Sequence, residues 1–225
     1  VVRDVTHEQE LEQMKRDFLS VVTHELKTPL TSIEGYTKLL LMGKGGGLSD
    51  RQRTFAQTIS DQTTSLKEMI QNLLDITRLE GANLPINAVV IDPIDALTIA
   101  AESVRGSAQT RNMQVRLETG GFGKARIKAD PFRLQQVLGN LLGNAMKFTP
   151  EKGELGLSGG VKGREVWLAV TDTGRGIPPE ALPQLFNKFF QVTQGDTRVA
   201  GGAGLGLFIC KQLVEAQGGR IEVTS

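Results

Sequence analysis

The chain has 225 residues, a formal net charge of +1 and a hydrophobic fraction of 39%, which suits one large or two modest domains with a packed core. The near-balanced charge does not favour a nucleic-acid partner. The single cysteine, Cys210, excludes a disulfide framework or a thiolate metal site and suits a reducing, cytoplasmic setting. No apolar run approaches the roughly 18 residues of a membrane span, so we expect no membrane segment in this chain, whether its full-length parent is soluble or membrane-attached.

Two long helices are predicted in the first third of the chain. From about residue 8 to residue 42, apolar residues recur at helical spacing and form one stripe. The residues of this stripe are Leu11, Met14, Phe18, Val22, Leu26, Leu30, Ile33 and Leu40. The glycine-rich segment 43–50 then ends the pattern, with Ser49 or Asp50 as the N-cap of a second helix.

The second helix carries a heptad seam, in which apolar residues alternate at steps of three and four and Gln62 fills one position. The apolar residues of this seam are Phe55, Ile59, Leu66, Met69, Leu73 and Ile76. A single antiparallel hairpin offers too little partner surface for both stripes. We therefore expect two hairpins to pair as a four-helix bundle, which makes the protein a homodimer.

Beyond the segment 80–85 the pattern changes to short strands and helices. Strand-like runs occur at residues 88–91, 114–119, 125–129, 154–159 and 165–172. Helical runs are predicted near residues 94–111, 131–147, 179–189 and 205–217. These runs predict one α+β domain, an α/β sandwich with helices layered on a mostly antiparallel sheet.

His24, one of only two histidines, is predicted to lie on the polar side of the first helix. At about 100° per residue it points roughly 200° away from Val22 and Leu26, and Thr28 neighbours it one turn later. Pro29 has no N–H for the carbonyl of Glu25 and is costly inside a helix. A His–Glu pair more often belongs to a solvated polar face, but the proline shifts the interpretation towards a functional site.

A second constellation lies in the α+β region. NLLGNAMKFTP (140–150) places Asn140, Asn144 and Lys147 on one helix face, where amide oxygens suit Mg²⁺ and a lysine suits phosphate. DTGRGIP (172–178) follows a strand, and its glycines allow close approach of a ligand to the backbone. The glycine-rich turn at 201–206 leads into a helix whose N-terminus can bind an anion. Each signal is weak alone, but together they predict a magnesium–nucleotide pocket.

The sequence resembles the transmitter region of the sensor histidine kinases of two-component signalling. FLSVVTHELKTPLTSIEGY resembles the phospho-acceptor box, NLLGNAMKFTP the asparagine box, DTGRGIP and GGAGLGL the two glycine boxes, and LFNKFFQ the phenylalanine box. All five occur in the family's order and cover nearly the whole chain. The resemblance implies a signalling-helix lead-in at 1–18 that is similar to the end of a PAS sensor domain. It also implies a dimerisation and phospho-acceptor hairpin at 8–80 and an ATP-binding domain at 85–225.

This resemblance implies that His24 takes the γ-phosphoryl group of ATP and passes it to an aspartate in the receiver domain of a response regulator. Glu25 would be its acid–base partner, although spacing alone argues more strongly for Thr28. Thr28 would position water for dephosphorylation of the regulator, and Pro29 would let the bundle flex.

In the ATP-binding domain the resemblance implies that Asn144 is the magnesium ligand and Lys147 a phosphate contact. Asp172 would accept a hydrogen bond from the adenine amino group. The matching backbone positions around adenine and phosphates are Gly174, Gly176, Gly202, Gly204 and Gly206. Residues 192–203 would form a mobile lid, with the phenylalanines at 186, 189 and 190 as its hinge or docking face.

Two residues depart from the family pattern, and two other functions compete with the kinase. Phe148 replaces a frequent tyrosine, and Ala203 replaces a threonine. An ATP hydrolase of the related gyrase/Hsp90 type would carry a water-activating glutamate where this chain has Asn140, and it would lack the His24 hairpin. A non-enzymatic dimeric scaffold would not need the intact Asn144 and Asp172, and ATP binding distinguishes it from the kinase.

Overall fold

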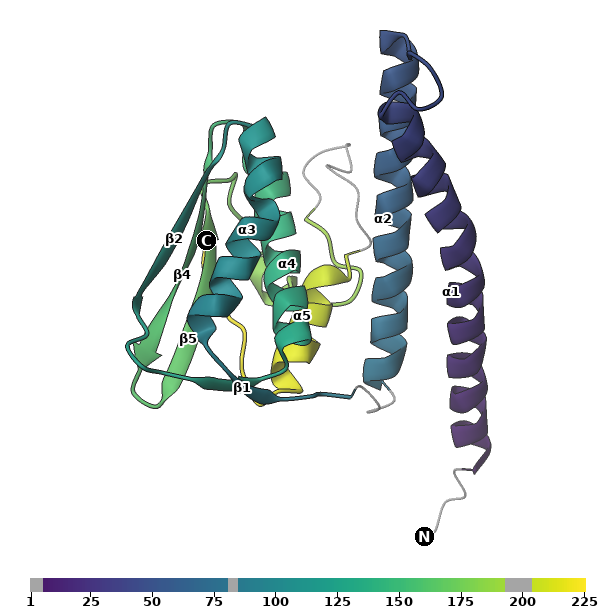
Figure 1. Cartoon of the computed structure of the whole chain (residues 1–225). Coiled ribbons are helices and arrows are strands. Elements are labelled where there is room, and N and C mark those ends of the chain that lie inside the picture. The colour runs from purple at the N-terminus through teal and green to yellow at the C-terminus, as the bar shows by residue number, and fades with distance from the viewer. Residues whose placement is uncertain (1–5, 81–84, 193–203) are drawn as a thin grey trace. The chain divides into compact units, whose positions relative to one another are not determined.

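The computed structural model describes residues 6–80, 85–192 and 204–225. Within these ranges, the side chains of residues up to 21, of residues 24, 68 and 73, and of residues 76–80 lie outside the description. The chain divides into two compact units, Val1–Leu84 and Pro85–Ser225. The first is a helical hairpin and the second combines helices with strands (Figure 1).

The hairpin consists of α1 (Thr6–Leu41) and α2 (Asp50–Glu80), as the apolar spacing predicts. Ser49 is the N-cap of α2, which confirms one of the two predicted positions. The Ser49 hydroxyl lies 3.4 Å from the N–H of Gln52, and the Gln52 side chain accepts the Ser49 N–H at 2.9 Å. This reciprocal arrangement is a capping box, and it fixes where the second helix begins.

The described side chains of the α2 seam are largely exposed in the single chain. Phe55, Ile59 and Leu66 are 55%, 50% and 44% exposed. The residues buried in this unit are mainly small or hydroxylated, namely Thr23, Leu30, Thr37, Ala56, Ser60, Thr63 and Asp75. Among the described residues, the hairpin thus closes mainly on small or hydroxylated side chains and leaves several large apolar side chains exposed, which suits pairing with a second hairpin.

The second unit is built on a three-stranded sheet in the order β2–β4–β5, with a separate β1–β3 pair. Its elements are β1 (Val89–Ile91), α3 (Pro93–Thr110), β2 (Gln114–Gly121), β3 (Ile127–Ala129), α4 (Pro131–Phe148), β4 (Glu154–Lys162), β5 (Glu165–Asp172) and α5 (Gly206–Glu215). β2 runs parallel to β4, and the other two strand pairs are antiparallel. The helices lie on one side of the sheet, so the predicted layering of helices on a sheet is confirmed (Figure 1).

The core of this unit lies between the helices and the sheet. Leu97 of α3, Leu142 of α4 and Leu157 of β4 are fully buried in one apolar cluster with Phe122. Burial of these side chains fixes one face of α4 against the core. The opposite face of α4 is left for polar residues. No helix in the described ranges is both long enough and apolar enough to cross a membrane.

The predicted helix at 179–189 is wrong. Only a short 3₁₀-helix, Leu182–Gln184, forms there, and turns occupy the rest of the segment. Pro178, Pro179 and Pro183 have no backbone N–H to donate, so a regular α-helix cannot be maintained across this stretch.

Asp130 fixes the start of α4. It accepts hydrogen bonds from the backbone N–H groups of Phe132 at 3.0 Å, Arg133 at 3.1 Å and Asn87 at 2.9 Å. Burial opposes ionisation of this carboxyl, but the three N–H donors outweigh it and lower its pKa. The carboxylate also ties the segment before β1 to the helix.

We predict that Asp130→Ala destabilises this unit by about 1–2 kcal/mol, the usual cost of a lost N-cap. Urea unfolding followed by the fluorescence of Trp167, the chain's only tryptophan and a residue of β5, measures the change. Because the native pKa is lowered, the stabilisation is present above the ordinary aspartate pKa and is lost as the pH falls through the native value. The exposed Glu151→Ala is the matched control. Equal midpoints for Asp130→Ala and wild type would refute the role.

Candidate functional site

The predicted histidine site lies in the middle of α1. His24, Glu25 and Thr28 all belong to this helix, and the Glu25 and Thr28 side chains are exposed. The His24 side chain lies outside the described residues. Since Thr28 follows His24 by one helical turn, the two residues share one side of α1.

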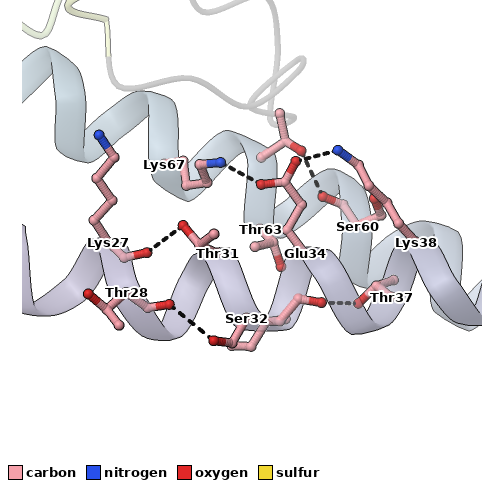
Figure 2. Close-up of polar contacts among 12 residues, drawn as sticks. Lys27, Thr28, Thr31, Ser32, Glu34, Thr37, Lys38, Ser60, Thr63 and Lys67 are labelled. Carbon is pink, nitrogen blue, oxygen red and sulfur yellow. Dashed lines mark hydrogen bonds and ion pairs between the residues drawn. The ribbon is translucent and has the colours of Figure 1, made fainter.

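α1 continues through Pro29 without interruption. Two hydroxyl groups bond to the helix backbone around the proline (Figure 2). Thr31 Oγ1 donates to the Lys27 carbonyl at 2.8 Å, and Ser32 Oγ donates to the Thr28 carbonyl at 3.4 Å. Bonds of this kind bend helices slightly. The turn after His24 therefore combines a missing backbone donor with two bonds from side-chain hydroxyl groups.

Glu34 joins the two helices of the hairpin farther along α1 (Figure 2). Its carboxylate accepts Lys38 Nζ at 2.6 Å and also accepts Nζ of Lys67 from α2. Hydrogen bonds from Lys38 and Lys67 lower the pKa of Glu34 to about 2. A lowered pKa means that this ion pair stabilises the hairpin above the ordinary glutamate pKa and is lost only as the pH falls towards 2. The contact therefore persists throughout the neutral range.

The second part of the site lies on the polar face of α4. Pro131 occupies the first turn of this helix, where its missing N–H costs nothing, and the apolar face packs into the core. Asn140 and Asn144 are half-buried, and Lys147 is more exposed. The helix therefore presents the three predicted side chains on its polar side.

Asn140 lies beside the first turn of α5. Its Oδ1 is 3.5 Å from the position that a Cβ on Gly206 would occupy. The Asn140 side chain also bonds to the thiol of Cys210, and the Cys210 Sγ donates to the Val137 carbonyl at 3.8 Å. Burial raises the pKa of Cys210 to about 12, so this thiol stays protonated. Asn140 therefore connects α4 to the predicted anion-binding end of α5.

Asp172 ends β5, where it lies opposite Leu155 of β4. Its Oδ1 accepts the Gly174 N–H at 2.8 Å, which helps to orient the carboxylate. A Cβ on Gly174 would lie 2.6 Å from this carboxylate and 2.8 Å from the Phe148 carbonyl oxygen. Only glycine allows the turn to approach the end of α4 so closely.

Of the remaining predicted glycines, Gly176 and Gly204 lie within the described residues and Gly202 does not. Gly176 lies in the turn after β5, whereas Gly202 and almost all of the predicted lid lie outside the described residues. Gly204 has a φ of 67°, which favours glycine, and its carbonyl accepts the Phe189 N–H at 2.9 Å. This bond joins the exposed Phe189 of the phenylalanine box to the second glycine box.

Sequence reasoning missed the contacts that surround Phe148. Arg175 Cζ lies 4.7 Å and Lys147 Nζ lies 5.1 Å from the centroid of the Phe148 ring. Arg111, at the end of α3, donates to the carbonyl of Thr149 at 2.8 Å and to that of Met146. No pattern around Arg111 could reveal these bonds, because they require the ends of α3 and α4 to meet.

The described residues contain no group of three or more His, Cys, Asp or Glu side chains that could hold a metal ion. A magnesium ion at this site would therefore depend on the amide oxygen of Asn144 and on oxygens of the ligand itself. Such a sparse protein ligand set is typical of Mg²⁺ bound together with phosphates. The donor chemistry thus fits the ion that the sequence predicts.

Two family models match separate parts of the chain. Residues 14–82 match the His Kinase A (phospho-acceptor) domain, and residues 129–225 match the histidine kinase-, DNA gyrase B- and HSP90-like ATPases. The chain is 36% identical over 225 residues to Sensor protein SrrB of Staphylococcus aureus (strain N315). This alignment covers 100% of the chain but only 38% of that relative.

Solved structures agree with these matches. Full-length ShkA, crystallised with AMPPNP, superposes with a TM-score of 0.69 at 30% identity over 90% of this chain and 41% of that one. The histidine kinase ThkA, in complex with the response regulator protein TrrA, gives a TM-score of 0.59 at 22% identity. That superposition covers 97% of this chain and 62% of ThkA, and it shows a shared fold.

We predict that Gly174→Ala destabilises the second unit by about 1–3 kcal/mol, because the added methyl group overlaps atoms that include backbone. Gly139→Ala is the matched control, since no heavy atom lies within 4 Å of its added Cβ inside α4. This control should instead stabilise the unit by about 0.5–1 kcal/mol through helix propensity. Urea unfolding followed by Trp167 fluorescence compares them, and shifts in the same direction would contradict the close approach at Gly174.

Proposed function

Because this chain belongs to the sensor histidine kinases, we propose that it phosphorylates itself on His24 with ATP. It then passes the phosphoryl group to an aspartate in the receiver domain of a response regulator. The observation that carries the proposal is that one chain matches both the family model of a phospho-acceptor domain and that of a histidine kinase-like ATPase. The predicted site residues fall inside these two matches.

The chemistry at the hairpin is a phosphoryl transfer. A ring nitrogen of neutral His24 attacks the γ-phosphorus of ATP, the bond from that phosphorus to the bridging oxygen breaks, and ADP leaves. Glu25 holds or takes the proton on the other ring nitrogen. Its exposure on α1 leaves it accessible for that role.

The second unit binds and orients the nucleotide in this proposal. Asp172 accepts a hydrogen bond from the adenine amino group, and the bond from the Gly174 N–H to its Oδ1 orients the carboxylate for this contact. Lys147 contacts phosphate. Asn144 would hold Mg²⁺ together with oxygens of the nucleotide, and the ion would supply charge neutralisation for the phosphates. Asn140 lines the same helix face, and the glycines let the backbone approach the ligand.

We infer that the functional unit is a homodimer. Phe55 and Ile59 of the α2 seam are half-exposed or more in the single chain. They line a groove of about 330 Å³ at the tip of the hairpin, together with Leu40 and Leu48. A second hairpin would cover these apolar side chains and complete a four-helix bundle.

We propose functional boundaries at 1–18 for the lead-in, 8–80 for the phospho-acceptor hairpin and 85–225 for the ATP-binding domain. The division into units 1–84 and 85–225 supports the last of these. In the full-length protein we propose a sensor domain, for example a PAS domain, before the lead-in. We place the chain in the cytoplasm, where ATP and a reducing environment suit its single thiol.

The side chain of Asn140 argues against ATP hydrolysis as the function of this chain. Water attack on ATP needs a carboxylate base at this position, and an amide cannot take a proton near neutral pH. The bond from Asn140 to Cys210 also shows that this side chain has a structural partner. Phosphate should therefore leave ATP mainly by way of His24.

We predict that His24→Gln abolishes labelling by γ-labelled ATP and reduces phosphate release to a trace, with ATP affinity nearly unchanged. The label on wild type should be lost in acid and survive alkali, as expected for a phosphoramidate. Filter-bound label, phosphate release and calorimetry measure these three quantities. Sustained multiple-turnover release by His24→Gln would favour a hydrolase, and failure of wild type to bind ATP would favour a scaffold.

We predict that Thr28→Ala retains autophosphorylation but loses most phosphatase activity towards the phosphorylated regulator, by about 10²-fold if Thr28 positions the attacking water. Thr58→Ala, which changes an exposed threonine of α2 whose hydroxyl also bonds to its own helix backbone, is the matched control. Dephosphorylation is followed as loss of label from the purified regulator. Equal rates for Thr28→Ala and wild type would remove Thr28 from the mechanism.

A further inference from the structure

A cavity of about 480 Å³ opens at the C-terminal end of α4, and its walls include Arg111, Lys147, Phe148, Thr149, Gly174 and Arg175. We propose that Arg175 is a further nucleotide-binding residue, which together with Lys147 receives the phosphate groups of the nucleotide beside the Phe148 ring. This inference rests on the proposed ATP-binding function, because Lys147 and Gly174 are also predicted nucleotide contacts. It adds a residue that the glycine-box pattern does not assign.

Two positive charges share one aromatic ring in this cavity. The Arg175 guanidinium and the Lys147 ammonium lie 4.7 Å and 5.1 Å from the Phe148 centroid. The ring attracts each cation, but the cations repel one another. Burial and the charge of Arg175 lower the pKa of Lys147, which reflects the cost of this arrangement. A ligand anion between them would relieve the repulsion.

The end of α4 does not cancel this positive charge. Carbonyl groups at a helix C-terminus attract cations and repel anions. Here the Arg111 guanidinium already donates to the carbonyls of Met146 and Thr149. No carboxylate is among the described residues that line the cavity. The Asp172 carboxylate lies beside Gly174, next to this lining. The lining itself carries three cationic side chains, those of Arg111, Lys147 and Arg175, and this excess of positive charge favours an anionic ligand.

A hydroxyl group in the cavity wall also lacks a partner. Thr149 is only 1% exposed, and its Oγ1 has no hydrogen-bond partner among the described residues. Buried hydroxyl groups without a partner are uncommon and usually bond to a ligand or an ordered water. The two cations and the aromatic ring of the cavity suit a phosphate attached to a nucleoside. Arginine is especially suited to phosphate because its planar head group donates two parallel hydrogen bonds.

The test compares the affinities of the full chain for ADP and for adenosine by calorimetry. The variants are Arg175→Gln and the conservative Arg175→Lys, with Arg164→Gln as the matched control. Arg164 is an exposed arginine in the turn between β4 and β5, outside the cavity. Asp172→Asn serves as the reference for lost base recognition, and Trp167 fluorescence confirms that each variant is folded.

We expect Arg175→Gln to weaken ADP binding about tenfold, a typical effect of removing one charge-assisted phosphate contact, and to leave adenosine binding within about twofold. Arg175→Lys should recover part of the loss. The ADP affinity of Arg175→Gln should also depend less on salt than that of wild type. Asp172→Asn should instead weaken ADP and adenosine alike.

Equal losses for ADP and adenosine in Arg175→Gln would overturn the proposal, since they would indicate a purely structural role. Unchanged ADP affinity, or an equal loss in Arg164→Gln, would overturn it as well. If wild type itself fails to bind ADP, the proposed nucleotide-binding function fails. If wild type binds ADP and labels His24 while Arg175→Gln matches it, only the role of Arg175 is wrong.

Discussion

The fixing of α4 at both ends is the constraint on which the nucleotide half of the protein depends. Asp130 holds the N-terminus through the N–H groups of Phe132 and Arg133, and Arg111 holds the C-terminal carbonyls. Between these anchors the apolar face is buried, so the helix cannot rotate without exposing Leu138 and Leu142. The polar side chains on the other face are therefore preorganised. This is how a fold can present amide, ammonium and backbone groups together before any ligand arrives.

The hairpin is packed differently from the second unit. Its interior is closed by residues such as Thr37, Ala56 and Thr63, and a lysine–glutamate contact from Glu34 to Lys67 links the two helices. Small and hydroxylated side chains allow close approach but bury little apolar area. Among the described residues of the hairpin, apolar side chains such as Phe55 and Ile59 remain exposed for a partner to cover.

Much of this organisation could be predicted from the sequence, because the signals were local. The capping residues Ser49 and Gln52 are three positions apart, and the strand before Asp172 is a continuous β-prone run. The direction of the α2 seam could not be predicted, since it depends on which face α1 covers. The contact of Arg111 with the end of α4 was also hidden, because it joins segments about 35 residues apart. The prolines at 178, 179 and 183 are a readable local signal against the helix that we expected at 179–189.

The burial of Cys210 makes the rate at which its thiol is alkylated a measure of local opening. This residue is the chain's only thiol, it is fully buried, and its hydrogen bonds join it to Val137 and Asn140 of α4. An alkylating reagent can reach it only in molecules where α5 has separated from α4, because reaction needs both access and a thiolate. The alkylation rate therefore counts local openings beneath the nucleotide-binding face. Any ligand that bridges α4 and α5 should lower the alkylation rate of Cys210 without changing the intrinsic reactivity of the sulfur.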